Sequence, residues 1–325
     1  MSHAIGMRSY LGIGFQSAHG VVADVLSAHW LPFVSESLVE NVPRIDSGEI
    51  RTTFDEGYSH QGLRTTAGDI TLEPTPYTLA VLGYAALGGI NTTSNASYNT
   101  HVLSGLATQW SEKFALPPFT LFVGRDCGSY TITKDCAANA LSLSMANGEL
   151  LKATLSVLGG SLDDKGADLS DSVTYQEGAE RHIPWNTTSI SLAGAAIGNI
   201  ISGTMGFNNN LEQIATMDTS VYPKRIKRTA KRQFTLEAQI AYEDLVHYTR
   251  LRGEAAHALS VNMHSGSNHF ATLAHGAVVY TAAPMNIAGP GPVTANITMR
   301  GHKGYAMGLT CKTSITKRVG SGPVS

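Results

Sequence analysis

The alternation of hydrophobic and polar residues predicts a chain built mainly from short strands. Several segments alternate, or stay apolar, over the length of one strand between turn-forming residues: "FTLFVGR", "SYTITKDC", "ANALSLSM" and "LKATLSVLGG". Two segments have helix signals instead. "TPYTLAVLGYAALGG" has an early Pro, a periodic apolar middle and a final Gly-Gly, and "AYEDLVHYTRLRG" ends in Gly. The predicted fold class is therefore mainly β, with short helices.

The order of these elements repeats along the chain. The phrase "RTTAGDITLE" at Arg64–Glu73 recurs as "RTAKRQFTLE" at Arg228–Glu237. Each copy leads into a predicted strand, a helix and further strands. "KATLSVLGG" at Lys152–Gly160 then occupies the same place as "TANITMRGH" at Thr294–His302. The repeat indicates a duplicated domain; chance similarity is the alternative, because Thr-Leu-Glu is a common strand phrase.

The repeat predicts two domains and a linker. Residues 1–160 form the first domain with an extended N-terminal segment, and residues 183–325 form the second. Residues 161–182 are polar and rich in Gly and Asp, which is typical of a linker. Residues 42–63 and 214–226 are expected to be irregular. A chain of 325 residues is long enough for two domains that each bury a core.

Composition excludes several classes of protein. The formal net charge of −2 argues against a dedicated binder of duplex DNA, which would carry a strong basic excess. No run of apolar residues is long enough to span a membrane, and the N-terminus has no signal-peptide pattern. The three cysteines, Cys127, Cys136 and Cys311, form no CxxC pair, so we expect no disulfide framework and synthesis in a reducing cytoplasm.

No motif indicates catalysis or a cofactor. There are twelve histidines, but His264, His269 and His275 do not have the spacing of a zinc site. Nucleotide-binding glycine loops and a nucleophile elbow are absent. We therefore expect no catalytic, cofactor-binding or metal-binding residues, no cofactor, and no enzymatic activity.

The clearest physical signal is a separation of charge between the two halves. The second half carries a basic cluster, and the corresponding region of the first half is mainly acidic: Lys224, Arg225, Lys227, Arg228, Lys231 and Arg232 against Glu36, Glu40, Asp46, Glu49, Asp55 and Glu56. Three interpretations are open: a solvated loop, complementary surfaces for self-assembly, or a nucleic-acid patch. The candidate contacts between subunits or rings are Glu49, Asp55, Glu56, Arg64, Lys224, Arg225, Lys227, Arg228, Lys231 and Arg232.

Beyond these patterns, several longer segments form a recognisable series by their order and spacing. In the first half they are "YLGIGFQSAHGVVADVLSAHWLPFVSESLVENVPRI" and "HQGLRTTAGDITLEPTPYTLAVLGYAALGG". "CAANALSLSMANGELLKATLSVLGG" closes that half, and "PWNTTSISLAG", "FNNNLEQ" and "YPKRIKRTAKRQFTLEAQIAYED" continue the series in the second. Together these segments cover about residues 10 to 310, and they resemble the tail tube (major tail) proteins of long-tailed bacteriophages.

The resemblance implies a structural virion protein made in the host cytoplasm. Each domain would be a β-sandwich or half-barrel of the tail-tube type with one flanking helix, so the chain would hold two in tandem. Rings of six such domains would need three chains, with a ring of six chains as the alternative. Stacked rings would surround a tape-measure protein and meet terminator and baseplate proteins, and DNA would pass the lumen without sequence-specific binding. We expect the basic cluster to lie in ring contacts and not on the lumen wall.

Other interpretations are a related ring-forming tail protein, such as a terminator or a baseplate hub, and a needle-like secretion tube. A host-binding or carbohydrate-binding β-sandwich is a further alternative. It would need clustered aromatic residues, whereas Trp30, Trp110 and Trp185 are dispersed.

Overall fold

Antiparallel strands make up most of the structure, which is a computed structural model. It describes residues 4–50, 55, 57–95, 97–105, 116–165, 168–176, 180–217, 220–266, 268–284, 293–302, 307–314 and 319. The described helices are α1 (Pro76–Leu87), α2 (Val246–Arg252) and the short 3-10 helices η1 (Gly6–Arg8), η2 (Val25–Ser27), η4 (Ser170–Ser172) and η5 (Trp185–Thr187). The fold is thus mainly β, as predicted.

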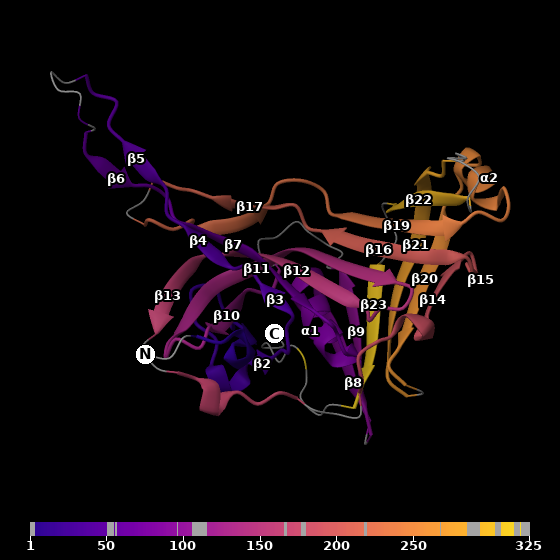
Figure 1. The fold of residues 1–325 in the computed structure, drawn as a ribbon, viewed down its shortest axis with the longest axis horizontal. Coiled ribbons are helices and arrows are strands. Elements are labelled where there is room, and N and C mark those ends of the chain that lie inside the picture. The colour runs from indigo at the N-terminus through magenta and orange to yellow at the C-terminus, as the bar shows by residue number, and fades with distance from the viewer. Residues whose placement is uncertain are drawn as a thin grey trace.

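A central antiparallel sheet runs through both halves of the chain (Figure 1). Its strands follow in the order β3 (Ser35–Glu36) with β4 (Val39–Asn41), β7 (Thr65–Leu72), β12 (Lys152–Gly159), the C-terminal part of β11 (Tyr130–Ala146), β16 (Ile200–Asn208), β19 (Gln233–Ala241), β22 (Thr294–Gly301) and the C-terminal part of β21 (Phe270–Ala282). The pair β11–β16 joins the first half to the second.

The long strands β11 and β21 leave the central sheet and continue into two smaller sheets. The N-terminal sheet has the order β2 (His29–Trp30), β1 (Tyr10–Phe15), β10 (Phe119–Gly124), β11 and β13 (Ser161–Lys165). The C-terminal sheet has the order β15 (Ala195–Ala196), β14 (Thr188–Leu192), β20 (His257–His264), β21, β23 (Met307–Thr313), β9 (Asn99–Gly105) and β8 (Gly88–Ser94).

One face of the central sheet forms the core. Leu143, Met205, Leu236 and Met299 are register partners across four strands, and each is at most 2% exposed. The hydrophobic cluster that contains them includes residues of both halves. Because side chains alternate between the faces of a strand, the intervening residues project from the opposite face.

Helix α1 packs inside the molecule, against β11 and between the central and C-terminal sheets (Figure 1). Thr75 caps its first turn in a capping box, Pro76 is the first helical residue, and Gly88 ends it with φ of 88°. Every residue except Tyr84 is buried. A helix that is apolar all round needs cover on all sides, and the sheets supply it.

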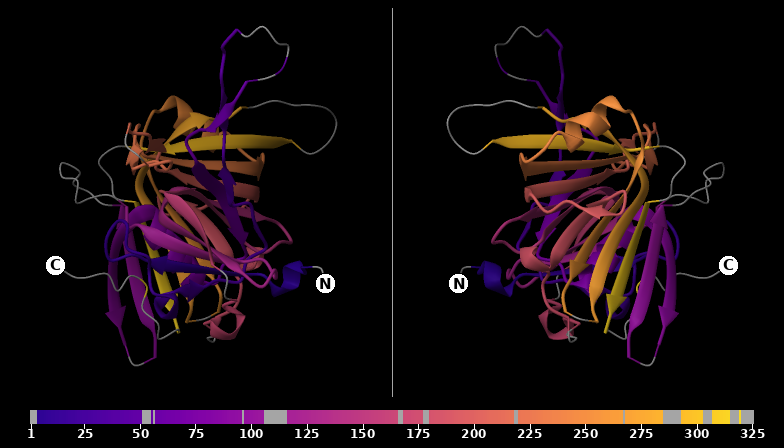
Figure 2. Two further views of the ribbon diagram at one scale, coloured as in Figure 1. Left: turned by 90° about the vertical axis from the view of Figure 1, so that its left-hand side faces the viewer. Right: turned by 90° about the vertical axis from the view of Figure 1, so that its right-hand side faces the viewer.

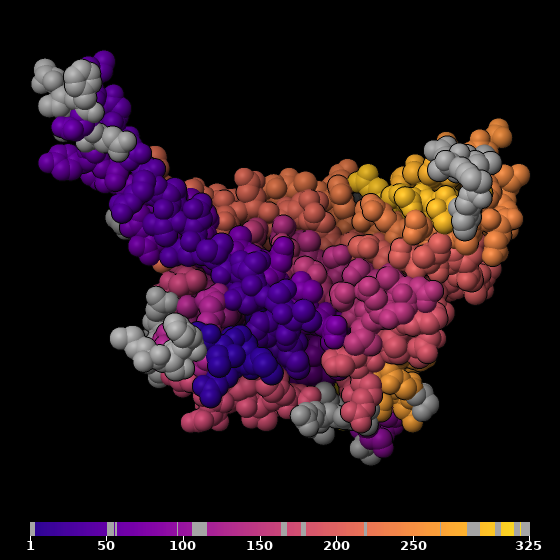
Figure 3. Space-filling view, in the orientation of Figure 1, coloured from indigo at the N-terminus to yellow at the C-terminus, as the bar shows by residue number. Residues whose placement is uncertain are grey.

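Two hairpins extend from the region between β4 and β7 and from the equivalent region between β16 and β19. We call β5 (Arg44–Asp46) and β6 (Ser59–Gln61), with the loop between them, the arm. We call β17 (Leu211–Ile214) and β18 (Arg225–Arg228), with the loop that joins them and residues 229–232, the basic hairpin. The arm projects away from the body in all views (Figure 2), and the space-filling view shows it standing clear of the surface (Figure 3).

Both predicted helices are confirmed. Residues 42–63 were expected to be irregular, and this was wrong, because β5 and β6 pair there as a hairpin. In the other stretch expected to be irregular, 214–226, only Ile214, Arg225 and Ile226 belong to strands among the described residues. The sequence also gave no sign of β8, β9 and β23. "SYTITKDC" and "ANALSLSM" were expected as two strands and form the single strand β11. Hairpin pairing and a change of sheet within one strand depend on distant neighbours, which local patterns do not encode.

The segment 161–182, expected as a linker, contributes to both the N-terminal sheet and the core. Strand β13 pairs with β11, and Glu180 is 7% exposed. The Glu180 carboxylate accepts from the amide of Tyr77 at 3.0 Å, in the first turn of α1, and from the amide of Ser314 at 2.6 Å. The segment therefore ties α1 to the end of β23. That it separates two domains stays a prediction.

Candidate assembly surfaces

The basic hairpin carries most of the cationic residues that the sequence singled out. Its strands pair antiparallel, with Leu211 opposite Arg228 and Ile214 opposite Arg225. Its exposed cations are Lys224, Arg225, Lys227 and Lys231. Exposed charges on the surface of a protein contribute mainly to the orientation of an approaching partner of opposite sign.

Arg228 differs from its neighbours because it holds the basic hairpin to the body. Its Nε donates to the backbone oxygen of Asn209 and its NH2 donates to Asn209 Oδ1, both at 3.0 Å. Asn209 is fully buried, and its Nδ2 donates to the carbonyl oxygens of Ala86 and Ala138 at 2.9 Å. Burial, with a smaller effect of Arg232, lowers the pKa of Arg228.

This contact lies at the C-terminal end of α1. The carbonyl of Ala86 is in the last turn of α1, where the helix dipole is negative. Asn209 lies between this carbonyl and the guanidinium of Arg228, and a positive charge near this end of a helix is favoured. Arg232 is also only partly exposed and lies against Gly105 at the end of β9. Two of the six residues of the basic cluster, Arg228 and Arg232, therefore make contacts within one chain.

Arg64 lies where the arm meets the basic hairpin. Its amide donates to Val221 O at 2.8 Å, its NH1 donates to the Tyr222 hydroxyl at 3.2 Å, and NH1 is 3.7 Å from Glu40 Oε1. The Tyr222 hydroxyl donates to Leu162 O at 3.3 Å. The structure thus brings Arg64 together with the loop of the basic hairpin, although the two are far apart in sequence.

The predicted acidic contacts lie on the arm. Glu49 and Asp55 are exposed, and Glu56 lies outside the described residues. The arm also exposes apolar side chains: Ile45 is 60%, Ile50 is 102% and Tyr58 is 76% exposed. An arm that presents both apolar and acidic side chains away from the body has the composition of an interaction surface.

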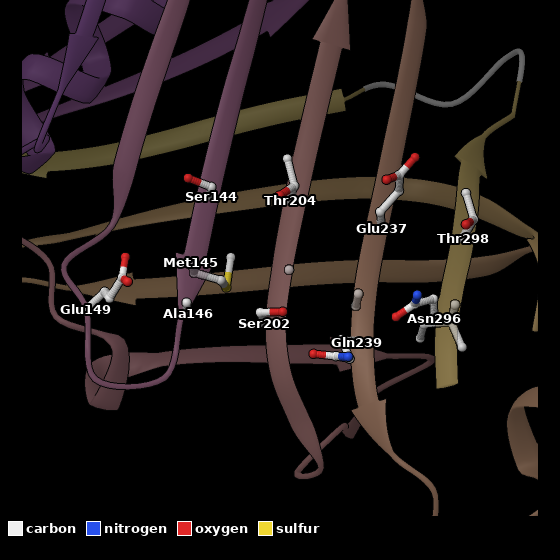
Figure 4. A pocket seen from close by; sticks show the side chains of 13 residues that line it. Ser144, Met145, Ala146, Glu149, Ser202, Thr204, Glu237, Gln239, Asn296 and Thr298 are labelled. Carbon is white, nitrogen blue, oxygen red and sulfur yellow. The ribbon is translucent and has the colours of Figure 1, made fainter. Parts of the chain in front are cut away.

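The open face of the central sheet forms a polar hollow of about 470 Å³ (Figure 4). Ser144, Thr204, Glu237 and Thr298 are register partners along one row of it. Its 13 lining residues include the carboxylates of Glu149 and Glu237 and no Lys or Arg. The sequence analysis did not identify this face. Its signal was the run of Ser, Thr and Asn at alternate positions of β11, β16 and β22.

The described residues show no cluster of side chains suited to binding a metal. No group of three or more His, Cys, Asp or Glu among them could hold a metal ion. His275 packs against Phe234, with ring centroids 5.1 Å apart, and burial lowers its pKa. All three cysteines are free, with Cys127 exposed and the other two buried. No helix in the described part of the chain is long and apolar enough to cross a membrane.

A sheet-rich fold with exposed hairpins and an open polar face defines a mainly β protein with surfaces suited to association. The chain belongs to the phage tail tube protein family, whose pattern it matches over residues 6–301. No curated protein gives a significant match. Membership implies a structural component of the virion tail that self-associates into a tube, which argues against an enzymatic role.

Proposed function

We propose that three chains form each ring of a phage tail tube and that stacked rings form the conduit for DNA ejection. The observation that supports a ring of three is the repeated order of strand pairing. In the first half β10, β11 and β12 are followed by β13, which pairs with β11. In the second half β20, β21 and β22 are followed by β23, which pairs with β21.

Two irregularities recur at the same places. The register shifts between Phe119 and Leu121 in β10–β11, and between His257 and Leu259 in β20–β21. A second shift falls after Ala138 in β11–β12 and after Tyr280 in β21–β22. Bulges are features of a particular fold, so their recurrence supports two tube domains in one chain. Because β13 has the place of β23, we end the first domain after β13 and not at residue 160.

The polar hollow is our candidate for the wall of the lumen. DNA must slide past this wall, so strong attraction for phosphate would oppose ejection. The hollow presents hydroxyl, amide and carboxylate groups without a cation. The basic hairpin is on β17–β18, outside the strands that line the hollow. This arrangement supports passage of DNA through the lumen without sequence-specific binding. In the assembled tube the same lumen would enclose a tape-measure protein.

Contacts between rings would come from the arm and the basic hairpin. The arm carries Glu49 and Asp55, and the basic hairpin carries Lys227 and Lys231. Complementary charges on neighbouring rings would set orientation and register, and the exposed apolar residues of the arm would be covered on stacking. Terminator and baseplate proteins would meet the same surfaces at the ends of the tube.

The test is charge reversal with Arg228 left intact. Lys227→Glu with Lys231→Glu should leave the subunit folded but stop tube growth, because the arm of the next ring would meet like charge. Negative-stain microscopy at high protein concentration would show tubes for the wild type and for the control Lys227→Arg with Lys231→Arg. Adding Glu49→Lys and Asp55→Lys to the reversed variant should restore tubes.

Normal tubes from the reversed variant would show that the basic hairpin is not a ring contact. Native mass spectrometry of rings gives the number of chains directly. Six chains per ring would refute the ring of three. That result would favour the alternative ring, in which each of six chains fills one of the six positions.

A further inference from the structure

Helix α2 is held to the rest of the chain by one buried side chain. The helix lies between β19 and β20 in the sequence and packs against β21 at the edge of the molecule (Figure 1). Leu245 and Val246, at its start, are 58% and 42% exposed, and His247 is the one buried residue of the helix. A helix of seven residues is not stable by itself. Its position therefore depends on the contacts that His247 makes.

These contacts centre on the hydroxyl of Tyr280 in β21. His247 Nδ1 is 2.7 Å from the Tyr280 hydroxyl oxygen, and the guanidinium of Arg250, one turn further along α2, also hydrogen-bonds to this hydroxyl. A guanidinium can only donate, so the Tyr280 oxygen accepts from Arg250. The hydroxyl hydrogen is then donated to His247 Nδ1, which is unprotonated in this assignment.

A second imidazole contacts the Tyr280 ring. The ring centroid of His257, in β20, is 6.3 Å from that of Tyr280, and the centroid of His247 is 5.9 Å from it. His257 Nε2 is buried and has no hydrogen-bond partner among the described residues. A proton added to this nitrogen would find no acceptor. We call His247, Arg250, His257 and Tyr280 the histidine cluster.

The charges around the histidine cluster disfavour a further positive charge. Strands β20 and β21 carry no Asp or Glu, and on α2 the guanidinium of Arg252 lies over the ring of Tyr248. The carboxylate that opposes Arg250 at His247 is the exposed Asp244, which also accepts from the amide of Val246 at 2.9 Å. Burial, together with the charge of Arg250, lowers the pKa of both histidines.

We propose that the histidine cluster is a proton-sensitive catch, which holds α2 on β21 at neutral pH and releases the helix on acidification. A proton on His247 Nδ1 and the hydrogen bond from Tyr280 compete for the same lone pair. A proton on His257 adds a positive charge beside Arg250 with no acceptor to receive it. When α2 leaves β21, the imidazoles reach water and bind protons freely. The inference concerns a single subunit and does not depend on how rings form.

The size of the effect follows from proton linkage. A histidine that is neutral only while α2 is docked titrates near pH 6.5 once the helix is released. Such a histidine shifts the equilibrium toward release by up to about tenfold between pH 7.5 and pH 5.5, and two of them shift it by up to about 100-fold. Because both pKa values are lowered in the docked state, docking is favoured at the higher pH and weakens as pH falls.

Hydrogen–deuterium exchange of the unassembled subunit, followed by mass spectrometry, tests the catch. After correction for the intrinsic exchange rate, α2 peptides should lose about tenfold or more in protection from pH 7.5 to pH 5.5, whereas α1 peptides should not. His247→Asn with His257→Gln should remove this loss, because side-chain amides form hydrogen bonds and do not titrate in this range. The matched control is His264→Gln, which changes an exposed histidine of β20 and should behave as the wild type.

Two results would overturn the inference: equal protection of wild-type α2 at both pH values, or an undiminished loss in the double variant. An equal loss of protection in α1 would also overturn it, because the whole subunit would then be unfolding. If the double variant does not fold, Tyr280→Phe decides. Without the hydroxyl, α2 should already exchange fast at pH 7.5 and change by less than about threefold on acidification. A loss as large as in the wild type would refute the catch.

Discussion

Replacing Asn209 by Ala should be among the most destabilising single substitutions in this chain. The residue is 0% exposed and stands between the C-terminal end of α1, the bulge of β11 and the basic hairpin. Its side-chain nitrogen donates hydrogen bonds to two carbonyl oxygens, and its side-chain oxygen accepts one from the guanidinium of Arg228. Truncation to Ala removes all three of these hydrogen bonds.

The size of the effect follows from these three bonds. Each neutral hydrogen bond contributes about 1 kcal/mol net, and a bond from a charged group contributes about 2 kcal/mol, so Asn209→Ala should cost about 4 kcal/mol. Arg228→Ala removes two bonds from a charged group, but Arg228 is partly exposed and water can take the place of its guanidinium, so the cost should be only about 2 kcal/mol. The double variant should lose less than the sum, since both changes remove the same Asn209–Arg228 bond.

The measurement is urea unfolding of the subunit at a concentration too low for assembly, followed by far-UV circular dichroism. With a slope of about 3 kcal/mol/M, the midpoint should fall by more than about 1 M for Asn209→Ala. Lys227→Ala is the control: it is the exposed neighbour of Arg228 and should change stability by at most about 0.5 kcal/mol. A loss below about 1 kcal/mol for Asn209→Ala would refute the assigned role of this residue.

Two further predictions concern the sheet edge and the buried histidines. A Cβ at Gly68 would lie 2.5 Å from Leu38 Cα and 2.6 Å from Ser37 O. Gly68→Ala should therefore push β3/β4 away from β7 and lower stability by about 2 kcal/mol. Gly48→Ala, with open space around it, should be neutral, and equal urea midpoints for the two variants would contradict this. Burial lowers the pKa of His247, with a further lowering by the charge of Arg250 and an opposing effect of Asp244. Burial also lowers the pKa of His275. These two side chains therefore bind protons less readily in the folded chain than in the unfolded chain, which binds them near pH 6.5, so stability should fall as pH drops through about 6.5. His247→Gln with His275→Gln should flatten the change in urea midpoint between pH 7 and pH 5, and an unchanged slope would show that other groups control it.

Local features of the fold were readable from the sequence. The helix α1 could be predicted because Thr75, Pro76 and Gly88 act on their own neighbours, and alternation marked most strands of the central sheet. The order of elements also pointed to a repeat. The ten-residue repeat at Arg64–Glu73 and Arg228–Glu237, however, does not match residues that are equivalent by strand pairing. It matches Leu72 to Leu236, whereas the pairing with β12 and β22 makes Leu72 equivalent to Ile240.

The candidate surfaces were only partly predictable. The sequence located the basic cluster and the acidic region, because charge is a property of each residue alone. It could not show that Arg228 and Lys227 have different roles. Arg228 is partly buried against Asn209 and Lys227 is exposed, and this contact forms only when β17 and β18 pair. The open face of the central sheet was missed because it is assembled from strands of both halves.

The sequence by itself determined both helices, most strands of the central sheet, the separation of charge and the family resemblance. Only the tertiary structure decided which strands pair, in which register, and which edges stay open. The physical reason is range. Caps, turns and alternation act over a few residues, whereas strand partners such as Ala140 and Asn208 are chosen by backbone hydrogen bonds and packing between distant parts of the chain.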